Sequence, residues 1–356
     1  MPSLPRKSVP LRIGSSIEAL TLLYLVSYVP YAVLTRWLAS APDTTLGRSL
    51  SGLEVLPATT LMSGVLTYLF VAASGWWRHA HCVRLGKRLW PHPTRWTALS
   101  GLGTALLLVT VPLSFTFRGA SIPFMQLLMR GDVLLVAPAV DLLTGRRVRW
   151  FSWAALGLVV VGLWSTIAAR GSLALPPLAI VTVVLYTLGY LIRLMVMSKV
   201  AKSGSEQSKQ GYFVEEKLVA IPAALVVLAL LSASRMGSQG YELWFGFVAV
   251  WSSRQLPYLL VLSVLLFVIS VFSLLILLDR RENTFCVPLE RSASVLAGVA
   301  AAYILAAMGT APAPTHAELT GASLLVAAIV LLSVGPRLAP CSTAARAAQP
   351  RRGSQP

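Results

Sequence analysis

The sequence contains ten apolar segments of about twenty residues, separated by short polar loops. The segments are 17–35, 53–73, 97–117, 121–142, 151–169, 175–198, 213–234, 256–278, 284–308 and 317–335. A helix rises about 1.5 Å per residue, so each segment can cross roughly 30 Å of hydrocarbon. Continuous apolar runs of this length favour helices over the short alternating strands of a barrel. We therefore predict an all-α integral membrane protein with about ten transmembrane helices.

The distribution of basic residues predicts the orientation of these helices. Only 12% of the 356 residues are charged, yet the net charge is +17. With the N-terminus inside, the inner loops hold most of the 30 lysines and arginines, as the positive-inside rule requires. We therefore expect a multi-pass protein of the plasma membrane (the inner membrane in bacteria) with both termini cytoplasmic. This arrangement explains the basic charge without nucleic acid as a partner.

Two apolar stretches leave alternatives open. Residues 241–251, "YELWFGFVAVW", are too few to span a bilayer, so we interpret them as an interfacial or re-entrant piece on the outer face. The first segment follows a basic stretch, as the apolar part of a signal peptide does. We favour its retention as a transmembrane helix, because Pro30, Arg36 and Trp37 make a poor cleavage region.

Residues 120–165 and 284–335 share a loose pattern of a proline, an arginine, an apolar run closed by glycine, and a second glycine twelve residues later. The matched residues are Pro123 and Pro288, Arg130 and Arg291, Gly145 and Gly309, and Gly157 and Gly321. Five crossings separate the copies, and an odd offset inverts the second copy in the membrane. The pattern predicts two inverted five-helix repeats, 17–169 and 170–335. A cytoplasmic segment, 1–16, precedes them, and a disordered cytoplasmic tail, 336–356, follows.

This rhythm of five plus five helices resembles the drug/metabolite transporter superfamily over about residues 17–335. The loops after the fourth and ninth helices read "LLTGRRV" and "AAMGTAP", without the glutamate that this family often carries there. The resemblance implies a secondary transporter that works by alternating access. Family members export metabolites in bacteria or exchange nucleotide sugars and sugar phosphates in eukaryotes, so the resemblance implies no single substrate.

Arg130 and Arg291 lie inside apolar segments, where a guanidinium costs at least roughly 2.5–3.5 kcal/mol. One hypothesis is that they bind an anionic group of the substrate, such as a carboxylate or phosphate. A second is structural pairing across helices, of Arg130 with Glu290 and of Arg291 with Asp132. A third is a gating role, in which such pairs form and break as access alternates.

Three other polar side chains are expected at membrane depth, Gln126, Tyr186 and Tyr190. The two tyrosines are four residues apart and therefore lie on one face of a helix. They line a cavity on one interpretation and only pack against neighbouring helices on the other. We include all three as candidate substrate-binding or gating residues.

Four further charges lie near the cytoplasmic ends of the sixth and seventh segments. We expect the long side chains of Arg193 and Lys217 to reach the interface. Glu215 and Glu216 are expected in a solvated first turn of the seventh helix, where acids are favoured, with proton coupling as the alternative.

No residue pattern indicates catalysis, a metal site or a cofactor. His79, His81 and Cys82 lie close together, but no further ligands cluster nearby, and there is no glycine-rich phosphate loop. We therefore expect a transporter of a small anionic or zwitterionic metabolite, not an enzyme. A coupling ion or exchange would drive it, and a homodimer is an open alternative to a monomer. The alternatives are a lipid-modifying transferase and a non-transporting sensor or assembly protein.

Overall fold

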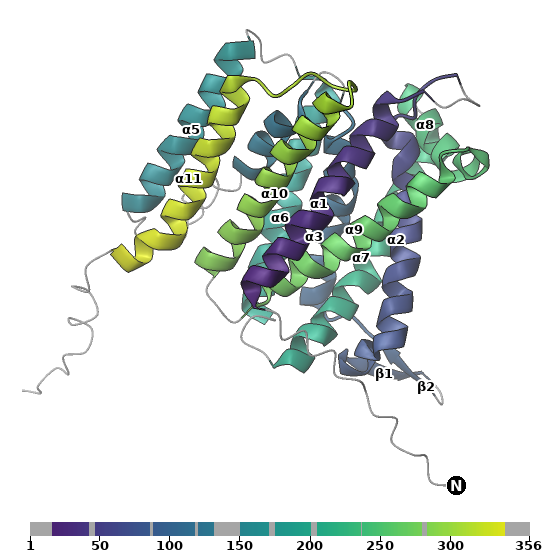
Figure 1. Cartoon of the computed structure of the whole chain (residues 1–356). Coiled ribbons are helices and arrows are strands. Elements are labelled where there is room, and N and C mark those ends of the chain that lie inside the picture. The colour runs from purple at the N-terminus through teal and green to yellow at the C-terminus, as the bar shows by residue number, and fades with distance from the viewer. Residues whose placement is uncertain are drawn as a thin grey trace, which may run out of the picture.

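The computed structural model describes residues 16–42, 47–85, 88–117, 120–131, 150–170, 175–200, 205–235, 237–279 and 283–338. These residues form a helical bundle with one short antiparallel hairpin (Figure 1). The helices are α1 (Ile17–Ser40), α2 (Gly52–Ser74), α3 (Arg95–Ser114), α5 (Trp150–Arg170), α6 (Pro177–Val200), α7 (Glu206–Ser234), α8 (Gly237–Val248), α9 (Leu256–Leu277), α10 (Asn283–Ala307) and α11 (His316–Leu338). A helical segment at 122–131 lies between α3 and α5, and the hairpin is β1 (Cys82–Leu85) with β2 (Arg88–Pro91). Two short 3₁₀ turns, η1 (Trp76–His79) and η2 (Val250–Ser252), complete the described elements.

Seven helices are long and apolar enough to cross a membrane: α1, α2, α3, α6, α7, α9 and α10. Two shorter apolar stretches, Trp153–Ala169 and His316–Leu332, lie within α5 and α11. The predicted class of protein, an all-α protein with several membrane-spanning helices, is therefore confirmed. Ten crossings in two inverted repeats remain a prediction, partly because residues 132–149 lie outside the described residues.

The short apolar stretch at 241–251 forms the end of α8 and the 3₁₀ turn η2. The 12 residues of α8 are too few to span a bilayer, in agreement with the expectation from sequence. The helix packs against α2 and α7 at the end of the bundle opposite the β hairpin (Figure 1).

Polar caps place the helix ends where the loops begin. The side chain of Ser51 accepts a hydrogen bond from the Glu54 backbone, while the Glu54 carboxylate accepts one from the Ser51 backbone, which completes a capping box at the start of α2. Thr94 caps α3, and Ser205 caps α7. Helix α2 ends at Gly75, whose backbone φ of 73° is rarely adopted by residues other than glycine.

The helices pack in a regular set of pairs. α1 lies against α9 and α10, α3 against α6 and α7, α2 against α7 and α9, and α5 against α11. The α3–α6 contact depends on glycine, because a Cβ on Gly103 would lie 2.7 Å from the Gly189 carbonyl oxygen. Small residues allow this close approach of membrane helices.

Large apolar side chains cover the outward faces of the helices. Leu69, Trp164, Val184 and Leu230 are each at least 60% exposed. In a membrane such residues would face lipid tails, whereas a soluble protein rarely exposes so continuous an apolar surface. Polar side chains are instead gathered in the interior, where they form the candidate site.

Candidate functional site

A central cavity of about 90 Å³ lies among α1, α3, the 122–131 helix, α6, α7, α9 and α10. Apolar wall residues from α3 and α9 surround a polar set from all of these elements. The polar lining residues are Tyr24, Tyr28, Thr104, Arg130, Tyr186, Tyr190, Arg193, Lys217, Ser270, Ser273, Glu290 and Arg291. The cavity thus collects all four basic residues that lie within the ten apolar segments, together with Glu290.

Arg130 is buried in this cavity with neutral partners. Its Nε donates to Gln126 Oε1 at 3.0 Å, one turn earlier on the same helix, and its Nη2 donates to Tyr28 Oη at 3.0 Å. Its Nη1 donates to the hydroxyl of Tyr186. These contacts place two of the candidate residues, Gln126 and Tyr186, beside Arg130 and add Tyr28, which sequence reasoning missed.

Arg291 reaches the same hydroxyl from the opposite side. Its Nη1 donates to Tyr186 Oη, so one tyrosine oxygen accepts hydrogen bonds from both arginines. The Arg291 Cζ lies 3.6 Å from the ring centroid of Tyr190, a close cation–π contact. Tyr186 and Tyr190 are stacked with 6.2 Å between their centroids, so together they form an aromatic wall that holds the two guanidinium groups.

Glu290 does not form the predicted salt bridge with Arg130. Its Oε1 accepts hydrogen bonds from Tyr24 Oη at 3.3 Å and Ser273 Oγ at 3.0 Å. Its Oε2 lies 3.4 Å from the Nε of its own neighbour, Arg291, without a hydrogen bond between them. Adjacent helical residues diverge at Cβ, but these two side chains are long enough to bend back into one cavity.

The second predicted pair, Arg291 with Asp132, falls outside the described residues, because the structure describes nothing beyond Gly131 until residue 150. The choice between substrate binding, structural pairing and gating therefore rests on the surroundings of Arg130, Glu290 and Arg291. A carboxylate oxygen and a guanidinium nitrogen remain without hydrogen-bond partners there. Buried polar atoms normally find partners, so such exceptions point to a functional site.

A second charged group, around Glu216, borders the same cavity. The Arg193 Nε donates to Glu216 Oε1 at 2.9 Å, and the Thr104 hydroxyl donates to the same oxygen. The Lys217 Nζ donates to Ser270 Oγ at 2.8 Å. Arg193 and Lys217 are 6% and 3% exposed, so the expectation that they reach the interface was wrong. Both side chains point into the bundle, where Glu216 on α7 and Ser270 on α9 accept their hydrogen bonds.

Glu215 also differs from its expected place in a solvated first turn. The helix α7 begins at Glu206, so Glu215 lies well inside it and is buried. Its carboxylate accepts hydrogen bonds from the His81 backbone at 2.8 Å and from the Thr97 hydroxyl at 2.8 Å. The His81 imidazole lies 2.7 Å away. This carboxylate therefore ties the β hairpin and the start of α3 to α7.

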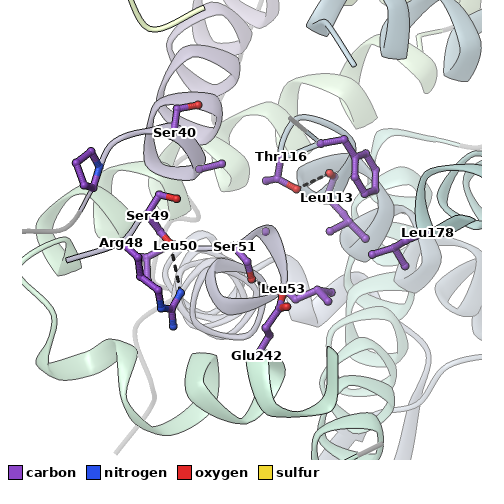
Figure 2. A pocket seen from close by; sticks show the side chains of 14 residues that line it. Ser40, Arg48, Ser49, Leu50, Ser51, Leu53, Leu113, Thr116, Leu178 and Glu242 are labelled. Carbon is purple, nitrogen blue, oxygen red and sulfur yellow. Dashed lines mark hydrogen bonds between the residues drawn. The ribbon is translucent and has the colours of Figure 1, made fainter. Parts of the chain in front are cut away.

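Larger spaces lie toward the ends of the bundle, and two of them are lined by both α3 and α6. One, of about 740 Å³, lies between the C-terminal ends of α1 and α3 and the N-terminal ends of α2 and α6. Figure 2 shows Arg48, Ser51 and Glu242 along one side of it and Leu113, Thr116 and Leu178 along another. The other, of about 460 Å³, lies at the hairpin end and is lined by the start of α3 and the last residue of α6, Val200.

The three spaces follow one another along α3. Thr97 lines the hairpin-end space, Thr104 the central cavity and Leu113 the space of Figure 2. At about 1.5 Å per residue, the sixteen residues from Thr97 to Leu113 cover about 24 Å. On α6 the same order runs in reverse, from Leu178 through Tyr186 to Val200. The central cavity therefore lies between two openings at opposite ends of the bundle.

Some of these residues left a signal in the sequence. Tyr24, Tyr28 and Tyr31 are spaced by four and three residues, which places them on one face of α1. Lys217 and Ser270 left none, because only packing of α7 against α9 shows that they meet. Among the described residues no group of three histidine, cysteine, aspartate or glutamate side chains could hold a metal ion.

Searches for known relatives add little to this geometry. No protein family matches the chain, and no curated protein matches its sequence. One solved structure, described as the crystal structure of a protein, has a TM-score of 0.46 and 17% sequence identity. That match covers 91% of this chain and all of the other. The interpretation of the site therefore depends on its own residues.

Proposed function

We propose that this chain is a secondary transporter of the drug/metabolite type, which moves a small anionic or zwitterionic metabolite by alternating access between two five-helix halves. The observation that carries this proposal is the convergence of Arg130 and Arg291 on the hydroxyl of Tyr186 in a central cavity. A guanidinium held only by neutral partners at membrane depth, as Arg130 is, is costly, and an anionic ligand would offset that cost.

The helix packing supports two equivalent halves. In the proposed repeat, α1, α2 and α3 of the first half correspond to α6, α7 and α9 of the second. The counterpart of the α1–α9 contact is then the α6–α3 contact. The counterpart of the α2–α9 contact is likewise the α7–α3 contact, and all four of these helix contacts occur in the bundle. The contacts α2–α7 and α5–α11 map onto themselves. This is the packing expected of an inverted repeat with its site between the halves.

The order of the three spaces supports alternating access. A solute entering from either end would meet the central cavity after about 10–14 Å, estimated from the helical rise along α3. The Arg193–Glu216 pair and the contact of Arg291 with Glu290 lie at the central cavity, where they could change as one end opens. A gating role, in which these contacts change as one end opens, is therefore part of the proposal.

Uptake into proteoliposomes tests the proposal. The wild-type protein should take up labelled small organic acids, and Arg130→Met and Arg291→Met should each abolish this uptake while the proteins insert normally. The control is Arg254→Met, which removes an exposed arginine. Normal uptake by both cavity variants would exclude a substrate-binding role. Recovery of activity by the exchange Arg130→Glu with Glu290→Arg would favour gating by pairs over direct binding.

A further inference from the structure

The central cavity has more positive than negative charge among the residues that the structure describes. Its basic lining residues are Arg130, Arg193, Lys217 and Arg291, its one described lining carboxylate is Glu290, and Glu216 lies behind Arg193. Arg193 is paired with Glu216, and Arg291 lies beside Glu290. Arg130 and Lys217 remain without a carboxylate partner in the described part of the chain.

Lys217 is the less expected of these two cations. Its ammonium group is buried and contacts the hydroxyl of Ser270 at 2.8 Å and the ring of Phe213, whose centroid is 5.6 Å away. A serine hydroxyl supplies no counter-charge. The neighbouring Glu216 carboxylate is already paired with Arg193, so an anion bound at Lys217 would offset the cost of burying this ammonium group.

The distance between the two cationic ends of the cavity follows from α9. Ser270 accepts from Lys217, and Ser273 donates to Glu290, which lies beside Arg291. The two serines are three residues apart, which corresponds to about 4.5 Å along the helix axis. The contact of Lys217 and the contact of Glu290, which lies beside Arg291, therefore fall about one turn apart on α9.

We propose that the transported solute is a small dianion with two acidic groups, one bound by Arg130 and Arg291 beside Tyr186, and the other by Lys217 beside Ser270. The proposal rests on the proposed transport function and names its substrate class. A short dicarboxylate has two charged ends at this separation. The cavity volume of about 90 Å³ suits a solute of this size and excludes nucleotide sugars in this conformation.

The test compares anions of similar length and different charge. Uptake of succinate and of glutarate into proteoliposomes is measured against uptake of butyrate, which has a single carboxylate. Thermal unfolding in detergent is followed with and without each acid. The variants are Lys217→Met, which removes the charge and keeps the length, and Lys217→Arg, which keeps the charge. Lys199→Met is the matched control, because Lys199 is an exposed lysine at the end of α6.

For the wild type we expect a preference for the two dicarboxylates over butyrate. Lys217→Met should reduce this preference at least about tenfold, the effect of one charge-assisted hydrogen bond, while butyrate uptake remains. Without ligand, Lys217→Met should unfold at the same or a higher temperature, because it removes a buried charge. The dicarboxylates should no longer raise that temperature. Lys217→Arg and Lys199→Met should retain the preference.

Three results would overturn the proposal. If butyrate is taken up as well as the dicarboxylates, the solute is not a dianion, although anion transport stands. If Lys217→Met lowers the unfolding temperature and keeps the preference, Lys217 is structural. If the wild type lacks the preference and Asp132→Asn gains it, Asp132 and not a second substrate acid balances the charge. Absence of uptake of every anion would instead reject the proposed function itself.

Discussion

Two clusters in the bundle combine arginine with hydrogen-bond acceptors. One surrounds Glu54 at the start of α2, beside the space of Figure 2, which we call the mouth of the bundle, and the other surrounds Arg130 in the centre. They differ in how far negative charge matches positive charge. Glu54 accepts two hydrogen bonds from Arg48, at 2.8 and 2.5 Å, and one from the Ser51 backbone. Arg130 donates only to an amide and two hydroxyls. At the mouth, charge is matched and the contacts fix the start of α2. In the centre, Arg130 has no carboxylate partner among the described residues, which costs stability and, under our proposal, favours the binding of an anion.

The largest effect expected from this difference is that of Arg130→Met on transport. Uptake should fall about a hundredfold, since charge-assisted hydrogen bonds are worth up to about 3 kcal/mol. The unfolding temperature should stay the same or rise, because the variant removes a buried charge without a counter-charge. Proteoliposome uptake and thermal unfolding measure the two quantities. A large loss of stability with normal uptake per folded protein would make the central cluster structural, like the cluster at the mouth.

The opposite result is expected for Glu54→Gln. Losing the two-pronged ion pair with Arg48 should lower the free energy of unfolding by about 2 kcal/mol, although glutamine can keep the capping box. Uptake per folded protein should remain. Glu242→Gln is the control, because Glu242 accepts one hydrogen bond from the Ser51 hydroxyl, at 2.6 Å, and makes no ion pair with an arginine that the structure describes. Abolished uptake in stable Glu54→Gln protein would show that the mouth takes part in transport.

Glu215→Gln tests a second cluster, at the hairpin end, in which a buried carboxylate has its hydrogen-bond partners. We expect a loss of about 1–2 kcal/mol in the free energy of unfolding, because an amide replaces a carboxylate that accepts several hydrogen bonds. The hairpin should loosen, so trypsin should cleave faster near the exposed Arg84. Digestion of the wild type and the variant, followed by mass spectrometry, measures this. Equal cleavage rates would mean that Glu215 does not hold the hairpin.

The smallest effect is expected for His81→Asn. The His81 side chain is 75% exposed although its ring lies 2.7 Å from Glu215. Solvent screens such a contact, so the loss in the free energy of unfolding should be no more than about 0.5 kcal/mol. Thermal unfolding at neutral pH measures it. A loss as large as that of Glu215→Gln would place the main contribution of this cluster in the imidazole and not in the backbone contacts.

The helices themselves could be predicted closely from the sequence. Each apolar segment coincides with a described helix within a few residues, except that the fourth is described only as far as Gly131. The reason is local, because a membrane leaves an apolar run of this length few alternatives to a helix. The predicted start of α7, at residue 213, was less accurate, because the helix begins at Glu206. Its polar first turns, from Glu206, lack the apolar character that marked the other helices.

The partners of the buried charges could not be predicted in the same way. The sequence indicated that Arg130, Arg291 and Glu290 lie at membrane depth, but it suggested a direct Arg130–Glu290 pair that does not form in the described structure. Both arginines contact Tyr186 instead. Which of several polar groups meets a guanidinium depends on helix rotation and on the lengths of the side chains, and neither is encoded in hydropathy.

The sequence alone determined that this chain forms long apolar helices and that a few charges must lie among them, because local hydropathy and helix length suffice for both. Only the tertiary structure decided that four cations from four helices share one cavity and that Lys217 faces inward with a serine as its hydrogen-bond partner. Such a site is assembled from residues more than a hundred and fifty positions apart. The packing of α7 against α3 and of α1 against α9 and α10 brings them together.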